Sequence, residues 1–118
     1  MAGVAKKSFS QPEEVRNAGS GRGDIVEIAG VKFLRMTLPP GWKWSKDVKP
    51  LAGTDSCQAK HVGTMIRGRM VVRHNDGSEQ EFGPGDLYEI QPGHDAWIVG
   101  DVEAVGLDVT GSENWAKQ

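Results

Sequence analysis

The 118-residue sequence contains a single cysteine, Cys57, so no disulfide bond can form within the chain. Packing alone must hold the fold together, which fits a reducing compartment. No apolar stretch approaches the roughly 18 residues that a membrane span needs, and residues 1–10 lack the apolar region of a secretory signal. These absences predict a cytoplasmic protein that does not bind a membrane.

An excess of charge of one sign is also lacking. The sequence has 14 Lys and Arg against 16 Asp and Glu, and its formal net charge is -2. Without long runs of like charge, a surface that attracts nucleic acid or anionic lipid is not expected. The 37% hydrophobic and 25% charged residues are those of an ordinary globular domain.

The composition predicts three segments along the chain. Residues 1–23 are polar and end in a Gly-rich stretch, so we expect an N-terminal arm that could dock on a partner subunit. Within this arm, Ser10 could cap a short helical turn that runs to about Asn17. Residues 24–110 form the predicted domain, and residues 111–118 form a C-terminal tail whose Trp115 should dock on that domain or on a second subunit.

From Asp24 onward, short stretches of β-forming residues alternate with Gly and Pro turns, and no helical apolar stripe is present. The Asn75-Asp76-Gly77 sequence is typical of a tight hairpin turn. A strand about every ten residues favours a sandwich or a closed barrel. The predicted strands cover residues 25–28, 31–38, 56–66, 70–74, 79–82, 87–90, 96–100 and 103–109.

A first group of residues resembles motif one of the cupin superfamily, and the likeness as a whole covers about residues 31–109. With Gly68 as the closing glycine of the motif, Asp55 and Cys57 stand where the family has two histidines. His61 stands where the family has a glutamate. The spacing of the family motif is therefore present, but its metal-binding residues are replaced.

A second group resembles motif two of the same family. It begins at Gly85 and continues through Gly93, but Ala96 stands where the family has its histidine, and His94 lies two residues earlier. The wider sequence is similar to a subgroup of small bacterial cupins of undefined function, some of which occur attached to nucleotide-cyclase-type domains. The resemblance implies an all-β, double-stranded β-helix (jelly-roll) barrel that follows the N-terminal arm.

A candidate metal site follows from the alternation of side chains in a strand. Residues two apart share a face, so Asp55, Cys57 and His61 should point the same way, which by the resemblance is into the barrel. His94, expected in a turn at the barrel mouth, could add a further imidazole. Cys57, His61 and His94, with Asp55 as an optional ligand, would suit one divalent transition metal such as zinc, iron, nickel, copper or manganese. The alternative is a metal-free pocket in which the thiol is a small hydrophobe and each imidazole is satisfied by hydrogen bonds.

The tryptophans are the candidate ligand-binding residues. Trp42 and Trp44 are two positions apart and could form an aromatic wall near the barrel opening. Met65 and Trp97 are further candidates for contacts with a ligand. The alternative for the Trp42 and Trp44 pair is that it covers the open end of the barrel or lies at a dimer contact.

Three classes of function are compatible with this pattern. The predicted function is that of a small-molecule-binding cupin domain with a pocket inside the barrel. The first alternative is a metal-dependent enzyme of the oxygenase, isomerase or lyase type, with Cys57, His61 and His94 as ligands and Asp95 or Asp55 as the proton carrier. Without a metal, His94 and Asp95 are the candidates for ligand recognition or proton transfer. The second is an interaction protein that uses the barrel as a scaffold. A homodimer is expected in each case, because cupins that resemble this chain commonly dimerise through their sheets.

Overall fold

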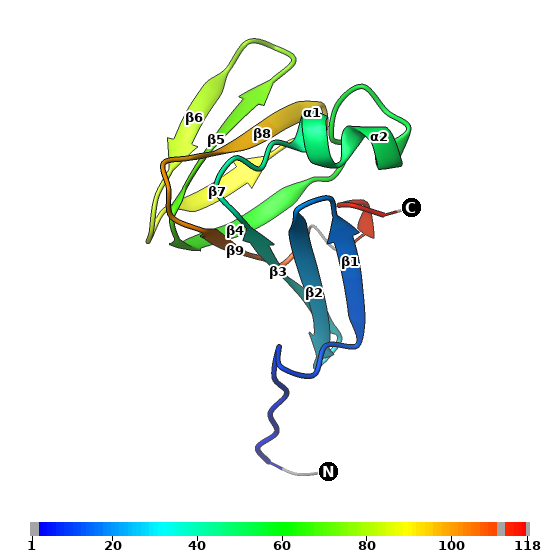
Figure 1. Cartoon of the computed structure of the whole chain (residues 1–118). Helices are drawn as coiled ribbons and strands as arrows, with labels where there is room; N and C mark the ends of the chain where they lie inside the picture. The colour runs from blue at the N-terminus through cyan, green and yellow to red at the C-terminus, as the bar shows by residue number, and fades with distance from the viewer. Residues whose placement is uncertain (1–2, 111–112, 118) are drawn as a thin grey trace.

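A computed structural model describes residues 3–110 and 113–117 of the chain (Figure 1). Strands dominate this part of the molecule, which confirms the predicted all-β class. Residues 1–2 of the predicted arm, and 111–112 and 118 of the predicted tail, lie outside the described residues. The described elements are β1 (Glu14–Ala18), β2 (Gly21–Ile28), β3 (Val31–Leu38), α1 (Trp44–Asp47), α2 (Lys49–Ala52), β4 (His61–Arg67), β5 (Arg69–His74), β6 (Glu79–Phe82), β7 (Leu87–Ile90), β8 (His94–Val99) and β9 (Ala104–Asp108).

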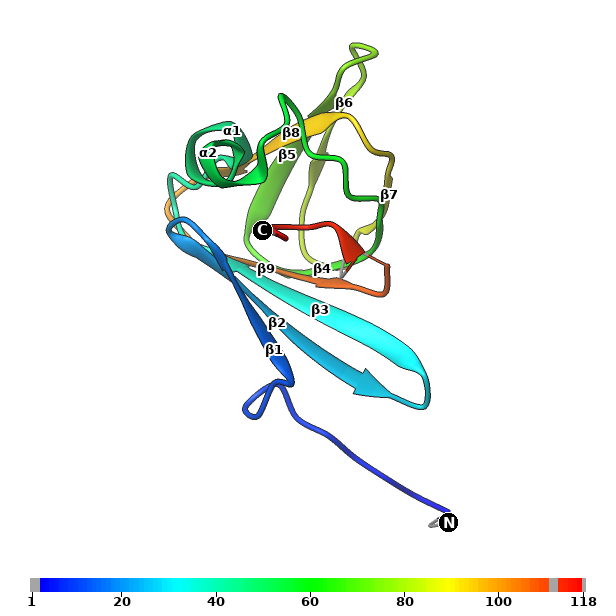
Figure 2. The same ribbon diagram turned by 90° about the vertical axis from the view of Figure 1, so that its right-hand side faces the viewer.

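Two antiparallel sheets face each other across the core (Figure 2). Within the described residues, the larger sheet has six strands in the order β1-β2-β3-β9-β4-β7, and the smaller has three in the order β6-β5-β8. Strand β9, near the end of the chain, lies between β3 and β4. This arrangement brings residues that are distant in the sequence to the same interior.

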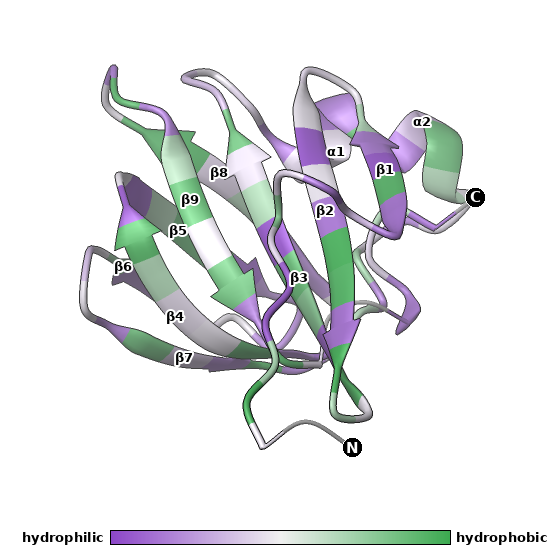
Figure 3. Ribbon diagram, turned by 90° about the horizontal axis from the view of Figure 1, so that it is seen from below, coloured by the Kyte–Doolittle hydropathy of each residue, from purple (hydrophilic) through white to green (hydrophobic). Residues whose placement is uncertain are grey.

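Side chains alternate between the interior and the solvent along most strands. On β8, His94, Ala96 and Ile98 are buried, and the residues between them are partly exposed. Apolar and polar residues accordingly follow one another along several strands in Figure 3. The interior between the sheets is filled mainly by apolar side chains, including Leu34, Met36, Leu38, Met65, Met70, Val72, Ile90, Ile98 and Ala104.

The predicted hairpin turn at residues 75–77 is confirmed and joins β5 to β6. Gly77 has a φ angle of 94°, in the left-handed region that glycine adopts without steric cost. The Asp76 carboxylate accepts a hydrogen bond from the backbone N–H of Ser78 at 2.8 Å. This turn sets the register of the smaller sheet.

The N-terminal region differs from the prediction. Residues 14–18 form strand β1 and not the end of a helical turn, and the hydroxyl and backbone N–H of Ser10 hydrogen-bond the Ser8 hydroxyl. Residues 14–18 form a strand because they pair with β2. The backbone hydrogen bonds along β2 outweigh the single side-chain cap that a helical turn would gain. The larger sheet therefore begins about ten residues earlier than the expected boundary at residue 24. The N-terminal end of the described chain extends away from the two sheets (Figure 1), whereas the Phe9 ring lies 4.9 Å from the Arg35 guanidinium and Glu13 N–H donates to the Ile25 carbonyl at 2.9 Å. Docking of the arm on a partner stays a prediction.

The segment before the candidate site also differs, because residues 44–52 form two helical turns where no helix was predicted. The Asp95 carboxylate accepts a hydrogen bond from the backbone N–H of Ser45 at 3.0 Å, and the Asp47 carboxylate accepts one from Lys43 at 3.0 Å. These bonds satisfy amides at the start of α1 that the helix itself cannot pair. No helix in the described part of the chain has the length and apolar character needed to cross a membrane.

Candidate metal centre

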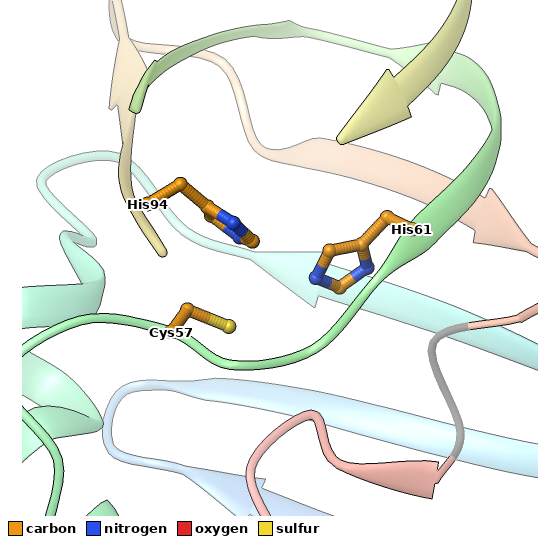
Figure 4. Close-up of side chains that lie close together, drawn as sticks. All are labelled: Cys57, His61 and His94. Atoms are coloured by element: carbon orange, nitrogen blue, oxygen red, sulfur yellow. The ribbon is translucent and has the colours of Figure 1, made fainter. Parts of the chain in front are cut away.

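Three buried side chains converge inside the barrel at one end of the core. They belong to Cys57, His61 and His94, and each residue is at most 3% exposed. Their potential ligand atoms all lie within 4.8 Å of one another. Figure 4 shows the thiol and the two imidazole rings pointing into a common space. The structure thus brings together the three residues that the sequence proposed as metal ligands.

Backbone pairing explains why Cys57 and His94 meet. Cys57 N–H donates to the His94 carbonyl at 2.7 Å, and Gly93 N–H donates to the Cys57 carbonyl at 2.7 Å. This isolated antiparallel bridge places the two side chains directly opposite each other. His94 begins strand β8 and does not lie in the expected turn, so strand geometry turns its side chain inward.

A hydrogen bond at Nδ1 orients each of the two imidazole rings. Nδ1 of His61 hydrogen-bonds the Asp108 carboxylate, and Nδ1 of His94 donates to the Gln91 carbonyl at 2.8 Å. An acceptor at Nδ1 keeps a proton on that nitrogen and directs Nε2 to the other side of the ring. Both Nε2 atoms are therefore available on the side of Cys57.

Asp108 and Tyr88 form a buried support that the sequence analysis missed. Asp108 is fully buried on β9 and accepts hydrogen bonds from His61 Nδ1 and from the Tyr88 hydroxyl. Two glycines leave room for this pair of side chains. A Cβ at Gly63 would lie 2.8 Å from Asp108 Oδ1, and a Cβ at Gly106 would lie 3.1 Å from the Tyr88 hydroxyl oxygen. Alternation along β9 was the available signal, because Asp108 is in phase with the buried Ala104.

The charges of these groups depend on one another. Burial raises the pKa of the Cys57 thiol, but hydrogen bonds from His61 and His94 outweigh burial and lower that pKa to about 6. Burial lowers the pKa of His61, but the charge and hydrogen bond of Asp108 outweigh burial and raise it to about 9. Burial and the Asp108 carboxylate both raise the pKa of Tyr88, which stays a neutral donor. These opposite shifts favour the charged forms of both Cys57 and His61 when no metal is bound.

A small cavity adjoins the cluster. Its volume is about 20 Å³, and the rings of Trp42, Trp44 and Trp115 line it together with the three clustered residues. A cavity needs at least about 10–15 Å³ of this kind of volume to hold one water molecule. The space is therefore suited to an ion or a water molecule, and it is far smaller than a pocket for a stacked organic ligand.

Two of the predicted ligand-binding residues do not line this cavity. Met65 is buried deeper in the core, where its sulfur would lie 3.7 Å from a Cβ at Gly106. Trp97 points to the outer side of β8, where the Lys43 ammonium group lies 5.1 Å from its ring centroid. Because His94 starts the strand, alternation places Trp97 on the opposite face.

Two predicted polar residues also lie away from the cluster. Asp95 follows His94 on β8, faces outward and bonds to the start of α1, so the structure does not pair it with His94 as a proton carrier. The Asp55 side chain is fully exposed, and its carboxylate lies 3.8 Å from the Lys49 ammonium group. The chain bends at residues 54–56, so the strand alternation that was expected to turn Asp55 inward does not reach it.

Comparison with known proteins gives information on the fold. No family model matches the sequence, and no curated protein matches it. A protein of unknown function from Rhizobium leguminosarum has a similar structure, with 18% identity, a TM-score of 0.63, and coverage of 92% of this chain and 97% of its own.

Two further solved structures carry a cupin description. A cupin-superfamily sugar phosphate isomerase from Silicibacter pomeroyi is 17% identical, with a TM-score of 0.60 and coverage of 88% of this chain and 73% of its own. A cupin-like protein from Thermotoga maritima is 15% identical, with a TM-score of 0.55 and coverage of 80% and 71%. At these identities the likeness extends to the fold alone. The chain therefore has the fold of the cupin β-barrels.

Proposed function

We propose that the barrel binds one divalent transition metal ion through Cys57 Sγ and the Nε2 atoms of His61 and His94. The observation that carries this proposal is the orientation of the imidazoles: both Nδ1 atoms hydrogen-bond an oxygen, and each ring has a potential ligand nitrogen within 4.8 Å of the thiol. A carboxylate or carbonyl behind each histidine is the usual support of a metal-binding imidazole. Thiolate and imidazole ligands favour zinc, iron, copper or nickel over magnesium or calcium.

The buried charges support the same conclusion. The lowered pKa of Cys57 favours a thiolate on one side of His61, and the Asp108 carboxylate lies on the other side. A divalent ion with two neutral imidazoles would balance both negative charges. Because unbalanced charge is costly in a protein interior, the centre is electrostatically complementary to such an ion.

Three protein ligands leave a coordination position open, which is the arrangement of catalytic and not of structural zinc sites. A metal ion in this setting supplies Lewis-acid polarisation of a bound oxygen atom. The proposed function is therefore that of a metal-dependent cupin enzyme acting on a small metabolite. The small cavity argues against a metal-free pocket that binds an organic ligand by stacking on Trp42 and Trp44.

Cobalt titration tests the metal site. Untagged metal-free protein should bind one equivalent of Co²⁺ and develop a thiolate-to-metal absorption band. The Cys57→Ser variant should lose this band, and His61→Ala and His94→Ala should bind the ion far more weakly. His74→Ala is the matched control, because His74 lies outside the cluster and bonds the Pro92 carbonyl. Equal cobalt binding by the wild type and all the cluster variants would refute the site.

A second candidate function rests on the same residues. Cys57, His61 and Asp108 form a chain of thiol, imidazole and carboxylate, which is the order of nucleophile, base and orienting group in cysteine hydrolases. Alkylation by iodoacetamide separates the two candidates. A metal ligand should be protected by Co²⁺, whereas a metal-free nucleophile should be alkylated at the same rate with and without the ion.

A further inference from the structure

We propose that the ligand at the open position is a small organic anion, held in a pocket between the C-terminal segment (residues 113–117) and the segment before β4. This inference rests on the proposed metal site and names the class of molecule that the site would accept. Three observations support the inference: the position of the pocket, the charge of the residues that line it, and the anchoring of the C-terminal segment that forms one of its walls.

The pocket lies directly outside the cluster. Its volume is about 270 Å³, and Trp44 and Cys57 line both this pocket and the small buried cavity. A molecule in the outer pocket would therefore lie next to one of the proposed metal ligands. The volume is slightly below the ~300 Å³ at which pockets for drug-sized ligands begin, which suits a small metabolite.

The lining of this pocket favours negative charge. Lys117 is the one cationic residue among its described lining residues, and the Asn114 amide adds hydrogen-bond donors. A Lys ammonium group is a compact charge that binds carboxylate or phosphate oxygens. The pocket thus carries positive charge beside a centre where a metal ion would add more.

A second hollow, between β6 and β7, has the opposite character. Its volume is about 190 Å³, and Asp76, Glu79 and Glu89 contribute to its lining. It meets the buried cavity only at the aliphatic residues Val72 and Ile90, with no proposed metal ligand in common among the described residues. Of the two hollows, the one that contains Lys117 is therefore the better route to the centre.

The C-terminal wall of the pocket is anchored to the barrel through Trp115. The Trp115 carbonyl accepts a hydrogen bond from Arg16 Nη1 at 2.9 Å, and the residue is 2% exposed. A Cβ at Gly23 would lie 2.5 Å from the Trp115 ring, so the absence of a side chain on β2 makes the space for it. Figure 2 shows this segment within the opening of the barrel. Lys117, two residues later, is thus attached to a fixed point.

Cobalt absorption of the loaded protein tests the inference. Succinate should perturb the Co²⁺ spectrum at lower concentration than its neutral analogue succinamide, and inorganic phosphate serves to distinguish a carboxylate preference from a general anion preference. The Lys117→Ala variant should bind succinate about tenfold more weakly, because a hydrogen bond to a charged group is lost. Lys32→Ala, which removes the same charge from the exposed start of β3, should bind succinate like the wild type.

The possible failures are distinct. Absence of stoichiometric cobalt before any anion is added would refute the metal site, and with it the inference. Normal cobalt binding combined with equal effects of succinate and succinamide would refute the anion preference alone. Equal succinate affinity in Lys117→Ala and Lys32→Ala would refute the assignment to this pocket, and phosphate binding as tight as succinate binding would overturn the organic class of the ligand.

Discussion

The two ends of strand β8 present the same degree of burial with opposite chemistry. His94 at one end is 2% exposed and faces a thiol and a second imidazole, whereas Ile98 at the other end is 7% exposed and belongs to the apolar core. Both side chains lie on the inner face of the same strand. The barrel therefore keeps a polar end and an apolar end within one interior.

This difference separates what stabilises the barrel from what serves its function. Buried apolar groups contribute directly to stability, whereas buried polar groups are costly unless each is hydrogen-bonded. At the polar end that requirement is met by a chain of partners that runs from Tyr88 through Asp108 to His61. An interior that needed only stability would be simpler to build from aliphatic residues.

Removal of Asp108 should have the largest effect on the polar end. Asp108→Ala leaves the His61 imidazole and the Tyr88 hydroxyl without their shared acceptor, so the free energy of unfolding should fall by about 3–5 kcal/mol. Urea denaturation of metal-free protein measures this change. Asp108→Asn, which keeps the volume and one acceptor oxygen, should lose less; equal losses in the two variants would show that the charge, and not the remaining acceptor oxygen, carries the effect.

Truncation at the apolar end should affect stability alone. Ile98→Ala creates a cavity and should lower the free energy of unfolding by about 2–5 kcal/mol. Cobalt stoichiometry and the thiolate band of the folded variant should match those of the wild type. A large decrease in cobalt affinity would mean that the two ends are coupled and would break the comparison.

The Tyr88→Phe variant should distinguish the contribution of Tyr88 to metal affinity from its contribution to the stability of the fold. The phenyl ring preserves the packing, and only the hydrogen bond to Asp108 is lost, so stability should fall by about 1–3 kcal/mol. Loss of a group that orients a metal ligand from behind should weaken Co²⁺ binding about 10- to 100-fold. Competition with a chelator of known affinity measures this effect, and unchanged affinity would contradict the supporting role of Tyr88.

The pH dependence of the metal-free protein should show the smallest effect. The folded pKa of Cys57, about 6, lies below the ordinary 9.0, so its stabilising contribution is present above pH 9 and is lost as the pH falls through 6. The folded pKa of His61, about 9, lies above 6.5, so its contribution is present below pH 6.5 and is lost as the pH rises through 9.

Between pH 6.5 and 9 these two slopes oppose each other, and the stability of the wild type should be nearly constant. Cys57→Ser retains only the His61 contribution, because Asp108 is the larger cause of the raised pKa. That variant should therefore lose stability as the pH rises, as urea denaturation in the presence of a chelator would show. A flat profile in Cys57→Ser would contradict the assigned charges.

Much of the fold and the core of the candidate site could be predicted from local patterns. Period-two alternation and motif spacing placed Cys57 and His61 on one inward face, and both are buried there. The Asp-Gly turn at residues 76–77 has a conformational requirement that is readable from two residues. These features depend on residues that are close in the sequence and on the two-residue repeat of a β-strand.

The remainder of the site depends on contacts that the sequence does not display. Asp108 lies 47 positions from His61, and only the pairing of β4 with β9 brings them together. Asp95 and Trp97 were misplaced because strand β8 begins at His94, two residues earlier than expected. Alternation therefore starts at His94 and places Asp95 and Trp97 together on the opposite face. Helix α1 was missed because the Asp95 carboxylate that bonds its first turn comes from a distant strand.

The three clustered side chains come from separate stretches of chain, namely the bridge at Cys57, the start of β4 and the start of β8. One ion bound to all three would act as a reversible cross-link between these stretches. By mass action, an ion that binds only the folded chain adds RT ln(1 + [M]/Kd) to stability. The melting temperature would then report the concentration of available metal, and a cell that deprived the protein of metal would also shorten its lifetime.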